Sequence, residues 1–451
     1  MAKLKPCTKY KESGVDWLGE IPEDWKVNRT KVLFKPIDER SKDGSEQLLS
    51  VSEHVGVKPR NQLKITMFQA ESYEGYKLCQ KGDLVINSLW AWKRGLGFSE
   101  YSGIVSTAYG VYRPKKSVSI DYKFFHYLYR TKKYVDQLYI ASRGIWKSRM
   151  QLSDSSFLNI LVAYPEFETQ IKARKYLEYK EKDIDKYIKK LKKEIALLKE
   201  YRQKIISQAV TCGLDENGEL RKKPEWNEGD PTPKGWKDSG VEWMGLIPEG
   251  WELLPGRAFF SEKKIKNVGM QEKQVLSLSY GKIIKKKDED LKGLVPESFE
   301  TYQIVSGGDI IIRSTDLQND KVSLRVGLVK DIGIITSAYL CLKVNRNLTS
   351  EYAYHLLHSY DIRKIFYSLG SGLRQNLSIT DFKFLPIVQP PHNEQKNIVS
   401  YVIDKTESID KQISEVEKQI NYIQEYKQSL ISKVVTGKID VRNINNNLSE
   451  D

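Results

Sequence analysis

The chain has 451 residues, of which 40% are hydrophobic and 29% are charged. This composition excludes a generally disordered chain and gives enough material for two or three folded domains. The formal net charge of +14 favours a polyanionic partner, for which nucleic acid and an anionic membrane surface are the usual examples.

Neither a signal peptide nor an apolar run long enough to span a bilayer is present in the sequence. We therefore expect a cytoplasmic protein that does not enter a membrane. Its four cysteines lie far apart and form no CxxC pair, which indicates neither a disulfide framework nor a cysteine zinc site.

The first predicted element belongs to an internal duplication. Residues 10–25 return as residues 236–251, with Ser-Gly-Val, a carboxylate, Trp, Gly, Ile-Pro and Trp at the same spacing. Residues 80–86 match 306–312 in the same way, and 103–109 match 333–339. These later segments are short β-branched runs bounded by Gly and Asp, which predict strands between turns.

Aromatic helices are predicted next, over 122–139 in the first half and 352–367 in the second. Each half therefore begins as a compact α+β domain. Because the two halves share their pattern, we expect two similar domains within one chain.

Each half ends in a long stripe of apolar residues with the alternating spacing of a coiled-coil seam. The first stripe comprises Leu177, Ile184, Ile188, Leu191, Ile195, Leu198, Ile205 and Ala209. The second stripe comprises Ile409, Ile413, Val416, Ile420, Ile423, Leu430 and Val434. From Ile184 and Ile409 onward the stripes keep one fixed offset, and both are broken by a basic residue, Arg202 or Lys427.

An ordinary amphipathic helix on a globular core would also produce one such stripe. Two matched stripes, each of about 40 residues and thus roughly 60 Å long, favour a paired rod instead. The first helix leads from domain one to domain two, so the second must run back to pair with it. We therefore predict an antiparallel coiled coil with pseudo-twofold symmetry.

The predicted organisation has six parts. They are a first α+β domain over 1–165, a central helix over 166–212, a linker over 213–235, a second α+β domain over 236–391, a distal helix over 392–436 and a flexible tail over 437–451.

No convincing catalytic constellation is present. Gln389-Pro-Pro-His392 resembles an adenine-methyltransferase motif only faintly, and a turn between a strand and a helix explains it better. His355 and His358 have a spacing that can serve a metal, but no third ligand stands nearby and a structural pair is favoured. The acidic run Asp288-Glu289-Asp290 with Lys292 is interpreted as solvated charge.

Basic residues interleaved with aromatics and amides recur in corresponding loops of both halves, which is the pattern expected of a DNA-contacting surface. In the first domain the predicted contacts are Lys58, Arg60, Ser88, Trp90, Trp92, Lys93, Arg94, Arg143, Trp146, Lys147 and Arg149. In the second domain they are Lys285, Lys286, Lys287, Arg313, Ser314, Gln318, Lys321, Arg325, Arg374, Gln375 and Asn376.

These loops hold different polar residues on a similar framework. Arg, Gln and Asn can make bidentate contacts to base edges, so the pattern predicts that each domain reads a different half-site of duplex DNA. A basic surface loop is by itself often only solvated, and a structural scaffold with an incidental basic surface is a competing interpretation.

With these features the chain resembles the specificity subunit of a type I restriction-modification system, over nearly its full length. The resemblance rests on the doubled signature at 10–25 and 236–251, on Asn393-Glu394-Gln395, and on the helix exit Val434 to Val441. The first repeat departs from this pattern, with Glu168-Thr169-Gln170 in place of Asn-Glu-Gln and an extra residue at Val210 to Gly213.

The resemblance implies a non-catalytic subunit that binds no cofactor itself. It implies assembly with two methylation subunits that bind S-adenosylmethionine and two restriction subunits that use ATP and Mg. It also implies that the outer faces of 170–212 and 395–436 contact the methylation subunits. The alternative is that the chain is itself a DNA adenine methyltransferase.

Overall fold

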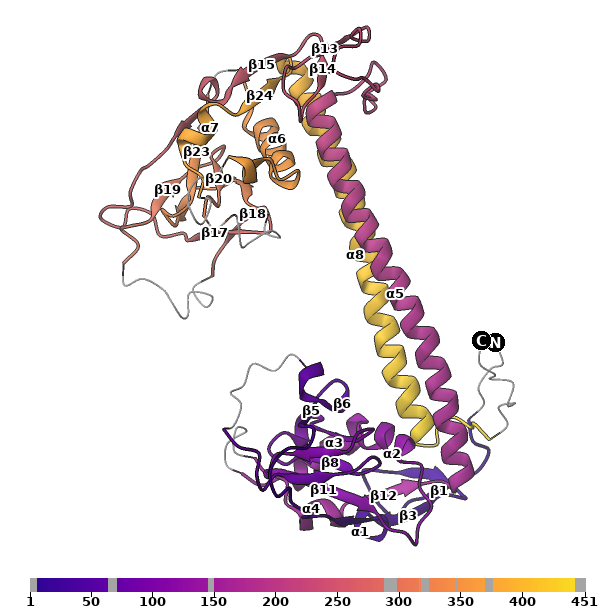
Figure 1. Ribbon diagram of the computed structural model, residues 1–451. Helices are drawn as coiled ribbons and strands as arrows, with labels where there is room; N and C mark the ends of the chain where they lie inside the picture. The colour runs from indigo at the N-terminus through magenta and orange to yellow at the C-terminus, as the bar shows by residue number, and fades with distance from the viewer. Residues whose placement is uncertain are drawn as a thin grey trace. The chain divides into compact units, whose positions relative to one another are not determined.

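The computed structural model describes residues 6–63, 71–144, 150–287, 298–315, 317, 324–345, 347–369 and 376–442. The chain divides into two compact units, residues 1–191 with 418–451 and residues 192–417. Each unit contains one domain and parts of both long helices (Figure 1).

The domain of the first unit is built on an antiparallel four-stranded sheet. Its order is β4 (Phe34–Pro36), β11 (Tyr109–Pro114), β8 (Leu84–Asn87), β9 (Leu96–Phe98). Four strand pairs surround this sheet: β1 (Tyr10–Glu12) with β2 (Glu20–Pro22), β3 (Lys26–Arg29) with β12 (Leu161–Tyr164), β5 (Leu49–Ser52) with β6 (Gly56–Pro59), and β7 (Lys77–Cys79) with β10 (Gly103–Val105). The helices are α1 (Thr30–Leu33), η1 (Arg60–Gln62), η2 (Ala91–Lys93), α2 (Tyr122–Tyr129), α3 (Lys132–Ala141) and α4 (Asp154–Asn159).

The domain of the second unit repeats this arrangement. Its sheet has the order β16 (Phe260–Glu262), β23 (Leu340–Val344), β20 (Ile310–Ile312), β21 (Val326–Leu328). The surrounding pairs are β13 (Trp236–Asp238) with β14 (Leu246–Pro248), β15 (Glu252–Pro255) with β24 (Pro386–Gln389), β17 (Leu276–Ser279) with β18 (Lys282–Lys285), and β19 (Gln303–Val305) with β22 (Gly333–Ile335). Its helices are η4 (Gly256–Ala258), α6 (Ser350–Ile362), η6 (Ile365–Ser368) and α7 (Ile379–Lys383). The predicted mixture of helix and strand, repeated in both halves, is confirmed.

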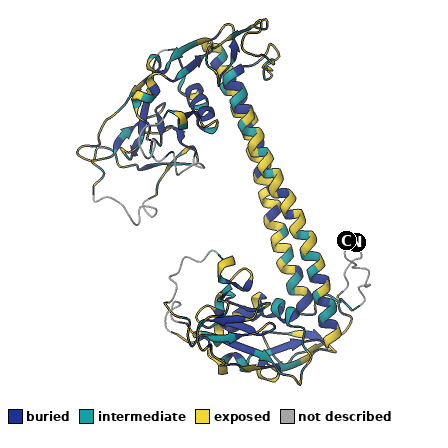
Figure 2. Ribbon diagram, viewed as in Figure 1, coloured by how far each residue is buried: buried dark blue, intermediate teal, exposed yellow. Residues whose placement is uncertain are grey.

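The central strands are apolar throughout because both faces of the sheet are covered. Leu84 and Ile86 point into the large aromatic core of the first domain, whereas Val85 between them packs in a smaller cluster on the other face. Ile310 and Ile312 are separated from Ile311 in the same way. Figure 2 shows this buried centre in each domain. A strand buried on both faces therefore needs apolar residues at successive positions rather than at alternate ones.

A buried glutamine near the start of each long helix ties the helix to its domain. Gln170 accepts a hydrogen bond from Asp121 N at 2.8 Å and donates one to Pro165 O at 2.8 Å. Gln395 makes three backbone bonds of 2.8 to 2.9 Å, to Asn347, Thr349 and Pro390. Asp121 and Thr349 also cap the first turns of α2 and α6. The glutamine thus fixes the position of a second helix as well as its own.

The long helices are α5 (Phe167–Cys212) and α8 (His392–Val435). Every residue of both predicted apolar stripes is buried or half-buried. In the first unit Leu177, Leu430 and Val434 share one core. In the second unit Ile205, Ile409 and Ile413 form a cluster of their own.

The basic residue that breaks each stripe binds acids on the other helix. In the first unit Lys427 Nζ lies 2.9 Å from Asp185 Oδ1 and 3.1 Å from Glu181 Oε1. In the second unit Arg202 Nε lies 2.9 Å from Asp410 Oδ1. α5 and α8 therefore contact each other within each unit.

The repeated Trp signature packs against the carboxyl end of a long helix. In the first unit buried Trp25 and Pro22 lie against Gly437, which follows α8, and Tyr10 Oη donates to Gly437 O at 3.2 Å. In the second unit Trp251 lies against Gly213, which follows α5.

The segment that follows Gly437 is packed in its first part, contrary to the expected flexible tail. Val441 is buried in the core of the first domain, and Arg442 forms an ion pair with Asp24 at 3.3 Å. Residues 443–451 lie outside the described part of the chain. The prediction of a loose tail is therefore wrong for its first residues, because Ile439 and Val441 supply apolar side chains to an existing core.

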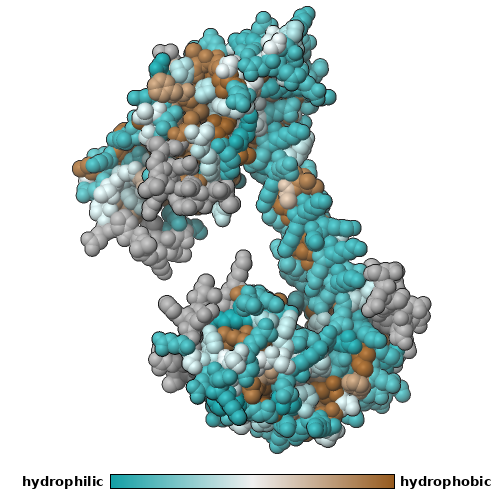
Figure 3. Space-filling view, viewed as in Figure 1, coloured by the Kyte–Doolittle hydropathy of each residue, from teal (hydrophilic) through white to brown (hydrophobic). Residues whose placement is uncertain are grey.

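The visible surface of α5 and α8 is mostly hydrophilic (Figure 3). Within the residues that the structure describes, no helix combines the length and the apolar character needed to cross a bilayer.

Candidate nucleic-acid interface

Two of the predicted DNA-contacting loops of the first domain lie side by side. The first follows β8 and spans 88–95, and the second leads from α3 to α4. Leu152 N donates a hydrogen bond to Ser88 O at 2.9 Å, which joins them. Arg143 and Gln151 exchange two backbone hydrogen bonds of 2.9 Å, which closes the base of the second loop. The backbone thus places exposed Arg143 near the Trp90 loop.

The same junction occurs in the second domain. Leu377 N donates a hydrogen bond to Ser314 O at 2.8 Å, at the position equivalent to Leu152 and Ser88. Half-buried Arg313 and exposed Asn376 flank this bond. The duplicated scaffold therefore brings the same pair of loops together twice, with different side chains on them.

The loop after β8 is held rigidly by its own backbone and by Arg130. The guanidinium of Arg130 donates to the carbonyl oxygens of Arg94 at 3.1 Å, Leu96 at 2.6 Å and Glu53 at 2.5 Å. Burial lowers the pKa of Arg130 to about 10, which still leaves it protonated at neutral pH. Arg130 therefore supports the loop from α2.

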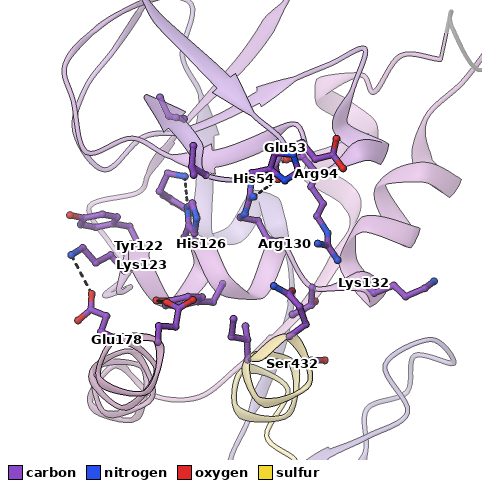
Figure 4. A pocket seen from close by; sticks show the side chains of 18 of the residues that line it. Glu53, His54, Arg94, Tyr122, Lys123, His126, Arg130, Lys132, Glu178 and Ser432 are labelled. Carbon is purple, nitrogen blue, oxygen red and sulfur yellow. Dashed lines mark hydrogen bonds and ion pairs between the residues drawn. The ribbon is translucent and has the colours of Figure 1, made fainter. Parts of the chain in front are cut away.

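Lys58 and Arg94 share a pocket of about 760 Å³ between the domain and the ends of α5 and α8 within the first unit (Figure 4). Lys58 lies over the ring of Tyr101, with its Nζ 5.3 Å from the ring centroid. Lys123, Arg130 and Lys132 line the same pocket. The third predicted segment, Lys58 to Arg60, therefore lies near Arg94, at the end of the loop that follows β8.

Acidic side chains on α5, together with Glu100, balance part of this charge. Lys123 is paired with Glu178 at 3.3 Å and with Glu100 at 3.7 Å. Tyr127 donates a short hydrogen bond to Glu181, and burial is the main reason why the pKa of Tyr127 is raised. Lys58 and Arg94 lack such a carboxylate partner among the ion pairs of the described residues. They are therefore the cations of this pocket best placed for a phosphate.

The second domain has a smaller pocket beside its own loop junction. It measures about 420 Å³ and is lined by Ser314, Tyr339, Lys264, Lys266 and Ser378, among others. Sequence reasoning missed its two lysines.

The predicted contact Lys285 lies apart from this pocket, on the β17–β18 hairpin. Its Nζ forms an ion pair with Asp331 at 3.1 Å, and Lys286 and Lys287 follow it in the chain.

Three predicted contacts in these loops have structural roles instead. Arg325 is fully buried, and its guanidinium donates to the carbonyl oxygens of Arg313 at 3.1 Å and Thr315 at 2.8 Å. The prediction that Arg325 contacts DNA is therefore wrong for this structure, because the side chain braces a loop from inside. Ser88 and Ser314 are also buried, and their carbonyl groups make the loop junctions.

Several other predicted residues lie outside the described part of the chain. They are Trp146, Lys147, Arg149, Gln318, Lys321, Arg374 and Gln375, together with the acidic run 288–290 and Lys292. The remaining predicted side chains are accessible. Trp90, Lys93, Arg143, Lys285, Lys287 and Asn376 are exposed, and Lys58, Arg60, Trp92, Arg94, Lys286 and Arg313 are half-buried.

Lys123, Arg130 and Lys132 were missed because they occur in the segment 122–139, which the sequence analysis interpreted only as an aromatic helix. The signal that could have found them is their position on the polar side of those helices. α2 buries Phe124, Phe125 and Leu128 and leaves the Lys123 side chain partly exposed.

The His355 and His358 pair lies on α6, and Tyr354 stacks on the His358 ring at 5.7 Å. Burial lowers the pKa of His355 to about 3 and that of His358 to about 4, so both are neutral at pH 7. No group of three possible metal ligands occurs among the described residues. All four cysteines are buried and none forms a disulfide bond in the structure.

The chain is similar over nearly its full length to two curated proteins of Methanocaldococcus jannaschii. It is 22% identical to the type I restriction enzyme MjaVIII specificity subunit, over 94% of this chain and 95% of that protein. It is 23% identical to the putative type I restriction enzyme MjaX specificity subunit, over 94% of this chain and 96% of that protein.

A structure solved to explain assembly and conformational transition of the type I restriction-modification system has the same fold. It matches 92% of this chain and 98% of its own, with a TM-score of 0.56 and 14% identity. No protein-family model matches the sequence. Taken with the two full-length relatives, this fold identifies the chain as a homologue of the specificity subunits of type I restriction enzymes.

Proposed function

We propose that this protein is the DNA-reading subunit of a type I restriction-modification complex and recognises a bipartite duplex target, one half-site per domain. One observation carries the proposal. The same backbone bond, Leu152 to Ser88 and Leu377 to Ser314, brings the same two loops together in both domains. The side chains on those loops differ between the domains. A repeated scaffold with different reading residues suits two different half-sites.

Reading by each domain combines two kinds of contact. Lys58, Lys93 and Arg94 in the first domain, and Lys285 to Lys287 in the second, bind phosphates and supply most of the affinity. Arg143 in the first domain, and Arg313 and Asn376 in the second, contact base edges and supply specificity. The predicted residues outside the described part of the chain remain part of this proposal.

The two long helices set the distance between the half-sites in this proposal. They pair antiparallel along their whole length, with one domain at each end and a pseudo-twofold axis between them. Support comes from the ion pair of Lys427 with Asp185 in one unit and that of Arg202 with Asp410 in the other. The proposed boundaries are 1–165 and 236–391 for the recognition domains, 166–212 and 392–436 for the spacer helices, and 213–235 for the linker.

The chain has no catalytic role of its own in this scheme. Two methylation subunits hold S-adenosylmethionine, and two restriction subunits use ATP and Mg. The names of the similar proteins, which are specificity subunits of restriction enzymes, support such partners. The outer faces of α5 and α8, where residues such as Lys189 and Glu415 lie, are the proposed contact for the methylation subunits.

The direct test begins with the modified adenines of cells with and without the gene, mapped across the genome. A split motif that disappears with the gene gives the target. Binding of the full chain, together with the subunits that purify with it, is then measured on duplexes with either half-site scrambled.

Scrambling either half-site should weaken binding, and Arg143→Ala should relax only one half-site while Arg313→Ala relaxes only the other. Each lost base contact should cost about 1–3 kcal/mol of discrimination. Equal binding to scrambled duplexes would refute the proposal. Methyl transfer by the purified chain alone would instead favour the methyltransferase alternative.

A further inference from the structure

Two large apolar side chains stand exposed at the tip of the loop after β8. Leu89 is 41% exposed and Trp90 is 56% exposed, and they are neighbours in the chain. Tyr139 and Ile140, at the end of α3, are exposed as well, and Trp92 packs edge-on against Tyr139 at 6.3 Å. A contiguous exposed apolar patch of this kind usually marks a binding surface.

The loop presents these side chains on a fixed backbone. Trp90 N donates to Asn87 O at 2.9 Å, Gly95 N donates to Trp90 O at 3.0 Å, and Asn87 N donates to Gly95 O at 2.7 Å. The indole of Trp92 donates to Leu89 O at 3.0 Å. Because the backbone is held on both sides, little conformational entropy is lost when Leu89 and Trp90 meet a partner.

A cation lies beside the apolar tip. Lys93 Nζ lies 5.9 Å from the centroid of Trp90 and 5.1 Å from that of Trp92, so both rings face a cation. Arg94 follows directly in a left-handed conformation, with its backbone carbonyl held by Arg130. An exposed apolar tip with a lysine and an arginine next to it in the chain fits a base stack flanked by phosphates.

We propose that Leu89 and Trp90 form a wedge that enters a groove of the first half-site and stacks against the bases of an opened base step. Lys93 and Arg94 bind the flanking phosphates. This inference rests on the proposed function and adds to it that the first domain reads its half-site partly through DNA deformation. Flexible pyrimidine–purine steps are the expected substrate, because they open at the lowest cost.

The aligned positions of the second domain carry no large apolar pair. Fully buried Ala91 and Leu317 occupy equivalent places in the two loops, so Leu89 and Trp90 align with Thr315 and Asp316. Asp316 lies outside the described residues, but its carboxylate is chemically unsuited to stack on bases between phosphates. The deformation should therefore be confined to one half-site, which gives the test an internal control.

The experiment uses the full chain with its co-purifying subunits and the mapped target duplex. 2-Aminopurine replaces one adenine at a time in each half-site, and its fluorescence reports local unstacking. The variants are Trp90→Ala, Trp90→Phe and Phe384→Ala, where Phe384 is a similarly exposed aromatic of the second domain. Circular dichroism and urea unfolding establish that each variant is folded.

Fluorescence should rise on binding at one step of the first half-site and at none of the second. Trp90→Ala should abolish the rise and weaken target binding by roughly 5- to 150-fold, the loss typical of one base–aromatic stack. Trp90→Phe should keep most of the fluorescence rise and most of the affinity, and Phe384→Ala should change neither the fluorescence rise nor the affinity. Specific binding with no fluorescence change, or an unchanged affinity of Trp90→Ala, would refute the wedge while leaving the proposed function intact. Failure of the wild type to distinguish target from scrambled duplex would refute the proposed function itself.

Discussion

Replacing Gly437 by alanine tests whether the Trp signature of the first domain rests on the end of α8. Gly437 has a φ of +71°, and an added Cβ would lie 2.5 Å from Pro22 Cδ and 3.1 Å from Trp25 Cζ2. The left-handed backbone alone costs alanine roughly 1–2 kcal/mol. Overpacking against a proline and a buried indole adds roughly 1–3 kcal/mol. The expected loss for Gly437→Ala is therefore about 2–5 kcal/mol.

Gly218→Ala is the matched control. Gly218 has a φ of +76°, and no atom lies within 4 Å of its added Cβ, so only the backbone cost applies. Urea unfolding gives the free-energy change of each variant, and amide hydrogen exchange of β1 and β2 shows where protection is lost. If Gly437→Ala costs no more than Gly218→Ala, or leaves exchange in β1 and β2 unchanged, the packing described here is wrong.

Three further predictions concern groups that hold the domains and helices together. Burial lowers the pKa of His126 to about 3, so the unfolded chain, in which the pKa is about 6.5, takes up a proton first as the pH falls. The free energy of unfolding should therefore fall by about 2 kcal/mol between pH 6.5 and 4.5 because of this group. His126→Gln should lessen that fall in urea titrations at the two pH values. Gln395→Ala loses three buried hydrogen bonds to the backbone and should lower the free energy of unfolding by about 3 kcal/mol. Gln170→Ala loses two and should lower it by about 2 kcal/mol. A negligible change in the free energy of unfolding for both variants would contradict the anchoring role. Arg202→Asp should destabilise the protein by up to about 1 kcal/mol, a small effect because Asp410 is partly exposed. Adding Asp410→Arg should restore the lost stability. If the losses of the two single variants simply add in the double variant, the ion pair does not contribute to stability.

The sequence was most informative where a physical pattern repeats. The two stripes, from Leu177 to Ala209 and from Ile409 to Val434, could be predicted because their burial follows from helical periodicity alone. The strand at 310–312 could be predicted because β-branched residues lie between a Gly-Asp turn and a polar loop. The sequence even located the break at Lys427, although not its partners Glu181 and Asp185, which depend on how the helices face each other.

The candidate DNA-binding site was harder to predict because backbone hydrogen bonds determine how its loops are positioned. The carbonyl groups of Ser88 and Ser314 join the reading loops, and any residue type could supply a carbonyl. Arg325 was misassigned because a buried guanidinium that binds loop carbonyls has the same sequence signature as one that binds DNA. Val441 is packed because it contacts the core of the first domain, which is formed by residues far from it in the sequence.

The measurement closest to the central claim is the spacer length of the target after the helices are lengthened. Seven residues added after Glu194 in α5 and after Gln419 in α8, equivalent positions of the repeat, keep the apolar stripe in phase and extend a paired rod by about 10 Å. The proposed function predicts the same two half-sites in the map of modified adenines, with the unread spacer longer by about three base pairs at 3.4 Å each. Modification of the original sequence at its original spacing by a folded, active complex would contradict it.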